Sequence, residues 1–129
     1  MPRNAEDVET FLYRLNRNFE RSGESMFLVA GDGGPPVVVY VNDPIVVVHV
    51  DIGKPPNDEG KQLHLYRQLL EYNGVGLVHA SYAIEDGEVT LSAGLALENV
   101  DQNELAAVLS DIDLALALHM PKLRELMME

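Results

Sequence analysis

The chain has no cysteine, and its basic residues are few. The absence of cysteine excludes a disulfide framework, a thiolate nucleophile and a zinc site built on sulfur ligands. Nine Lys and Arg residues stand against 21 Asp and Glu residues, which gives a formal net charge of −12 at pH 7. Because such a surface repels phosphate backbones and anionic lipid, we expect no nucleic-acid partner and no membrane partner.

Long apolar runs are also absent. No window of the sequence approaches the roughly 20 apolar residues of a membrane span. Residues 1–7 lack the apolar core of a signal peptide. The 129 residues fit one domain, which at this size buries roughly two-thirds of its unfolded surface. We therefore expect a single domain over residues 1–129, located in the cytoplasm.

The motifs of an active site are missing as well. The Gly-Asp-Gly-Gly segment at residues 31–34 is not followed by the Gly-Lys-Ser/Thr of a phosphate loop, and no serine lies in a Gly-x-Ser-x-Gly elbow. The four histidines occur singly, without the spacing of a metal site: His49, His64, His79 and His119. We expect no catalytic residue, no cofactor and no metal, and hence a protein that is not an enzyme.

Three segments show helical periodicity. Asn4 is suited to cap a first helix over residues 5–21, whose apolar stripe is Val8, Phe11, Leu12, Leu15 and Phe19. A second helix follows the proline-rich residues 54–60 and ends at Asn73, with Gly74 just beyond it. Asp101 and Glu104 have capping-box spacing for a long third helix, in which Pro121 should cause a kink or a restart.

Five segments are expected to form strands: residues 26–30, 37–41, 45–52, 77–85 and 88–98. The glycine and proline content of residues 31–36 predicts a loop there. Residues 42–44 separate two strands with the spacing of a three-residue hairpin loop, and Asp86-Gly87 is a strong two-residue hairpin signal. This order predicts an α+β fold with an antiparallel sheet of about five strands and helices at the N-terminus, in the middle and at the C-terminus.

The strands at residues 37–41 and 45–52 are apolar at nearly every position, whereas an antiparallel strand with one wet face should alternate. We expect Val46, Val48, Val50 and Ile52 to face the core. A second apolar face would need a cover, and this predicts a homodimer. The candidate partner or dimer surface comes from the outer face of this hairpin and from the second helix: Val39, Val41, Ile45, Val47, Leu65, Leu69 and Tyr72.

The order of segments in the second half of the chain forms a pattern. The helical residues 65–73, Leu-Tyr-Arg-Gln-Leu-Leu-Glu-Tyr-Asn, are followed by an expected strand, the Asp86-Gly87 turn, a further expected strand and then Asp101-x-x-Glu104-Leu105. This pattern resembles the type III secretion chaperone-like superfamily, which includes the Tir-chaperone family and YbjN-type proteins. The resemblance covers residues 5–127. It implies a small cytosolic homodimer without an active site, which holds an extended segment of a secreted protein against apolar patches and sheet edges.

Two alternatives to this function stay open. YbjN-type relatives suggest a regulatory or structural dimer without a client. A small ligand-binding domain would instead need a pocket between the first helix and the sheet, lined by Tyr13, Tyr40, Tyr66 and His79.

Overall fold

A computed structural model describes residues 3–30 and 34–129, so the predicted loop over residues 31–36 lies partly outside it. The helices are α1 (Ala5–Arg14), α2 (Glu59–Gly74) and α3 (Gln102–Met127). The strands are β1 (Phe19–Ser22), β2 (Met26–Val29), β3 (Val37–Asn42), β4 (Ile45–Gly53), β5 (Ser81–Glu85) and β6 (Glu88–Ala96). All pair antiparallel in one sheet of order β1-β2-β3-β4-β6-β5. The predicted α+β class is confirmed, with six strands rather than about five.

The sixth strand comes from residues that were predicted to be helical. The first helix ends at Arg14 rather than near residue 21, because Asn16 adopts the left-handed conformation with φ +57°. A turn at Gly23, with φ +84°, then pairs Phe19–Ser22 with Met26–Val29. The ring of Phe19 meets Phe27 edge to face, 6.0 Å between centroids, so its helical spacing from Leu15 is coincidental.

The hairpin of β3 and β4 has a register different from the predicted one. Asn42 pairs with Ile45, so only Asp43 and Pro44 form the turn, and Val39 lies opposite Val48. A loop shorter by one residue turns every side chain of β3 to the other face of the sheet. Val39 is therefore fully buried, and Val41 packs against the core, so their assignment to the outer face was wrong.

The expected faces of β4 are confirmed for most of its length. Val46, Val48 and Val50 are fully buried, whereas Ile45 is 40% exposed and Val47 is half-buried on the other face. A bulge between Asp51 and Gly53 interrupts the alternation at the end of the strand.

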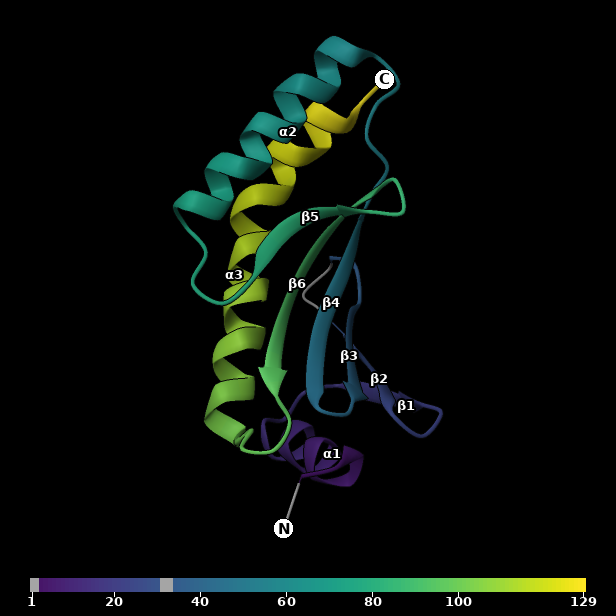
Figure 1. Cartoon of the computed structure of the whole chain (residues 1–129), viewed down its shortest axis with the longest axis vertical. Coiled ribbons are helices and arrows are strands. Elements are labelled where there is room, and N and C mark those ends of the chain that lie inside the picture. Colours follow the sequence, from purple (N-terminus) through teal and green to yellow (C-terminus); the bar gives the residue numbers. More distant parts are fainter. Residues whose placement is uncertain (1–2, 31–33) are drawn as a thin grey trace.

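The core lies between the sheet and the helices. Tyr82 of β5 contacts both Tyr72 of α2 and His119 of α3, which places the two helices on the same face of the sheet. In Figure 1, α3 runs along the sheet, α1 lies at its lower end, and α2 packs beside the upper part of α3. Helix α3 continues through Pro121 to Met127, so the predicted restart does not occur. Within the described residues no helix covers the opposite face, which we call the open face.

Candidate partner-binding surfaces

The sheet has two edge strands, β1 and β5. In β1, the N–H of Ala30 donates to the carbonyl of Asn18 at 2.9 Å. Because hydrogen-bonded pairs alternate along an antiparallel ladder, Glu20 and Ser22 also bond to β2. The N–H and C=O groups of Phe19 and Arg21 therefore point away from the sheet, and no described residue bonds to them. This is an open edge.

The side chain of Arg21 holds this edge in place. Its guanidinium donates to Glu6 Oε1 at 3.0 Å and to Glu9 Oε1 at 3.3 Å, both on α1, and it lies over the ring of Phe27. The hydrogen bond to Glu6 raises the pKa of Arg21, and the same bond lowers the pKa of Glu6. The hairpin of β1 and β2 is thus tied to α1 through side chains, and the outward backbone groups of β1 stay free.

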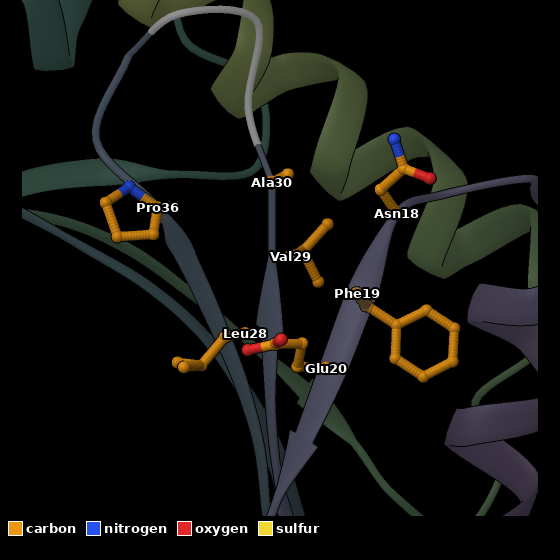
Figure 2. Close-up of a pocket in the computed structure, with 7 residues that line it drawn as sticks. All are labelled: Asn18, Phe19, Glu20, Leu28, Val29, Ala30 and Pro36. Carbon is orange, nitrogen blue, oxygen red and sulfur yellow. The ribbon is translucent and has the colours of Figure 1, made fainter.

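A pocket of about 480 Å³ lies at the end of β1 and β2. Figure 2 shows its seven lining residues: Asn18, Phe19, Glu20, Leu28, Val29, Ala30 and Pro36. Phe19 and Glu20 point to opposite sides of β1, as successive residues of a strand must. The pocket adds apolar contact area directly beside the open edge.

At the other edge strand, β5, side chains bond to outward backbone groups in the first half of the edge. Asn73, at the end of α2, accepts from the N–H of Tyr82 at 2.7 Å and donates to the carbonyl of Tyr82 at 3.0 Å. Asp111 of α3 accepts from the N–H of His79 at 2.8 Å and from that of Ala80 at 3.0 Å. Side chains from two helices thus close the first half of this edge.

The ring of Tyr82 is also fixed. Its hydroxyl lies 2.8 Å from Nδ1 of His119, and the imidazole stacks on Tyr72 with 3.6 Å between ring centroids. Burial lowers the pKa of His119, an effect that the negative charge of Asp111 partly opposes. Burial likewise raises the pKa of Tyr82 and, less strongly, that of Tyr72.

The seven residues predicted for a partner surface do not form one surface. Only Ile45 and Val47 lie together on the open face. Val39, Leu65 and Leu69 are in the core, so they are not accessible to a partner. Val41 packs against the core, and Tyr72 is partly covered by His119.

Other exposed aliphatic residues were missed as candidates. On α2, Leu63 is 67% exposed and Leu70 is 71% exposed, on the side of the helix away from Leu65 and Leu69. Four more lie on α3 and in the loop before β5: Val75, Val78, Leu114 and Leu118. The seven-residue spacing of Leu63 and Leu70 was the available signal, but spacing alone does not tell which of two apolar sides a helix buries.

The described residues hold no cluster of three or more His, Asp or Glu side chains that could bind a metal. His49 lies 2.9 Å from Asp51 and 3.8 Å from Glu85, but through opposite nitrogens of its ring. In residues 3–30 and 34–129 no helix is long and apolar enough to cross a membrane.

Comparison with known proteins decides the family. The CesT_Tir_1 family model matches residues 1–129. The chain belongs to this family of type III secretion chaperones. The resemblance predicted from the sequence is thereby confirmed. Comparison with curated proteins gave no match.

Solved structures share the fold of this CesT_Tir_1 member at low sequence identity. A chain of the heterodimeric ExoU–SpcU complex from Pseudomonas aeruginosa has a TM-score of 0.69 at 20% identity, over 93% of this chain and 97% of that one. YbjN from E. coli also has a TM-score of 0.69, at 12% identity, over 95% and 93% of the two chains. A chain of the complex between the Yersinia pestis type III secretion chaperone SycH and a YscM2 fragment has a TM-score of 0.61 at 19% identity, over 88% of this chain and 98% of that one.

Proposed function

We propose that this protein is a non-catalytic, chaperone-like homodimer of the cytoplasm that holds an extended segment of a partner protein. The observation that carries the proposal is the open edge of β1, where the backbone groups of Phe19 and Arg21 have no partner among the described residues. A segment lying beside β1 would bond to these groups and extend the sheet by one strand. Membership of a chaperone family supports the same role.

Apolar contacts would add affinity and selectivity to the backbone bonds. Alternate side chains of a bound strand point to opposite faces of the sheet. Those on one face would meet the pocket at the end of β1 and β2, which Leu28 and Pro36 help to line. Because the chain carries a net charge of −12, an acidic partner segment would be repelled.

The dimer contact is assigned to the outer side of α2, where Leu63 and Leu70 are exposed. Large exposed aliphatic residues at helical spacing are suited to cover one another across a two-fold axis. Figure 1 places α2 and β1 at opposite ends of the molecule. A dimer through α2 would therefore leave both copies of the β1 edge free to bind a partner.

A second candidate is a YbjN-type dimer without a client. It is favoured by the equal TM-scores, 0.69, to YbjN and to a chain of the ExoU–SpcU complex. Capture of binding proteins from the native cytosol separates the two, since only the chaperone-like protein should retain a specific segment. The ligand-binding alternative has less support: Tyr13, Tyr40, Tyr66 and His79 lie on separate elements, and Tyr13 is 77% exposed.

The matched pair Arg21→Pro and Arg21→Ala tests the β1 edge. Both variants lose the contacts of the guanidinium with Glu6 and Glu9, but only Arg21→Pro also loses the outward N–H. We expect Arg21→Ala to bind a captured segment about as well as the native protein. Arg21→Pro should bind it about tenfold more weakly, since one backbone hydrogen bond is lost and the ring obstructs the added strand. Equal affinity of two folded variants would refute edge binding at β1.

A further inference from the structure

The last residue of the segment 65–73, which carries the family resemblance, has a specific structural role in this chain. This residue, Asn73, lies part-buried at the end of α2 and bonds both the N–H and the C=O of Tyr82. A primary amide carries one acceptor oxygen and a donor nitrogen, as a peptide group does. Asn73 therefore takes the position that the backbone of a neighbouring strand would take beside β5.

A second outward position of the β5 edge, at Ala80, is also bonded to a side chain. Outward groups recur every second residue of an edge strand, so Ala80, Tyr82 and Ile84 point away from β6. Asp111 occupies the N–H of Ala80, and Asn73 occupies both groups of Tyr82. The carbonyl of Ala80 and both outward groups of Ile84 have no partner among the described residues.

Two identical β5 strands could pair antiparallel about their central residue, Ala83. In that arrangement Tyr82 of each copy would exchange hydrogen bonds with Ile84 of the other, and a two-fold axis would pass between the alanines. Ile84 alone cannot support this pairing. The amide of Asn73 therefore blocks both hydrogen-bonded positions of the symmetric contact at once.

We propose that Asn73, assisted by Asp111, closes the β5 edge against a second copy of this chain. An unprotected edge strand is a template for pairing with another chain, and covering it is a known means of preventing association. The closure concerns self-association through β5, so it does not depend on whether the protein holds a client. It is also distinct from the α2 contact assigned to the dimer.

A single introduced cysteine tests this closure, because the chain has none of its own. Ala83 is exposed, and in the symmetric pairing Ala83→Cys would lie directly opposite its own copy, close enough for a disulfide. Under mild oxidation, Ala83→Cys alone should stay uncross-linked. The double variant Asn73→Ala/Ala83→Cys should form a disulfide-linked dimer. As a control, Asn73→Ala with cysteine at the exposed Ala96 of β6 should not cross-link, since that position lies away from the edge.

Amide exchange of Tyr82 completes the test. Asn73→Ala should accelerate this exchange about tenfold, the equivalent of one lost hydrogen bond, while Asn99→Ala, at an exposed position, should not. Cross-linking of Ala83→Cys without the Asn73 change would overturn the proposal. So would faster exchange of Tyr82 without cross-linking in the double variant. If Asn73→Ala does not fold, Asn73→Asp keeps an acceptor for the Tyr82 N–H but no donor for its carbonyl, and the same cross-link is expected.

Discussion

The two edge strands of the sheet are held to the rest of the protein in different ways. β1 is held through a side chain: Arg21 bonds to Glu6 and Glu9 of α1, and the outward backbone groups stay free. β5 is held through its backbone, because Asn73 and Asp111 bond directly to the groups that another strand would use. Whether an edge can bind a partner thus depends on which of its groups the protein uses for anchoring.

The strands β3 and β4 lie between the two edges, and the comparison of the edges depends on the register of this pair. Mutations that test this register should have the largest effect. Val39→Glu should lower the free energy of unfolding by about 4 kcal/mol or more, because it puts an unpaired carboxylate in the core. Val47→Glu, on the open face, should cost less than about 1 kcal/mol. Urea denaturation measures both. Equal destabilisation would mean that the register of β3 and β4 is not the one described.

A smaller effect is expected at the β5 edge. Tyr82→Phe removes the hydroxyl that bonds to His119 and should cost about 1–2 kcal/mol. Tyr72→Phe is the control, since the hydroxyl of Tyr72 has no hydrogen bond to a described residue, and its cost should stay within about 0.5 kcal/mol. Thermal or chemical denaturation distinguishes them. A Tyr82→Phe variant as stable as the native protein would show that this bond does not help to anchor β5.

The smallest effect concerns pH. Burial holds the pKa of His119 below its ordinary value of 6.5, so the folded protein takes up this proton less readily than the unfolded chain. Its contribution makes the protein less stable as the pH falls from about 6.5 toward the folded pKa, and it levels off below that. A protonated ring carries N–H on both nitrogens, so Nδ1 can no longer accept from Tyr82.

His119→Gln should remove this part of the pH dependence, which denaturation of both proteins across the acid range measures. Loss of stability should be accompanied by faster amide exchange at Ala80 and Tyr82 but not at β1, where no histidine contacts the strand among the described residues. An unchanged pH profile in the variant would contradict the assignment.

Much of the architecture was predictable from local patterns. The order of elements, the fold class and the core face of β4 follow from hydrophobic periodicity and turn residues, each of which acts within a few positions. The end of α1 was not predictable in this way, because Phe19 continues the helical spacing of Leu15 while packing on Phe27 as a strand residue.

The candidate surfaces were harder to predict. The outer face of β3 depended on whether the turn has two residues or three, and one residue reverses every side chain. Leu65 and Leu69 share their helix with Leu63 and Leu70, so the positions of α3 and β5 decide which pair is buried. The contrast between the edges depends on strand order and on the contact between Asn73 and Tyr82 across the loop that joins α2 to β5, which hydrophobic periodicity does not reveal.

Residue-resolved amide exchange of the protein, free and bound to a captured partner segment, tests the central claim most directly. In the free protein, the amides of Phe19 and Arg21 should exchange fast and those of Ala80 and Tyr82 slowly. Binding should slow exchange at Phe19 and Arg21 and leave Ala80 and Tyr82 unchanged. Protection that appears at Ile84 and along β5, with no change at β1, would contradict the account.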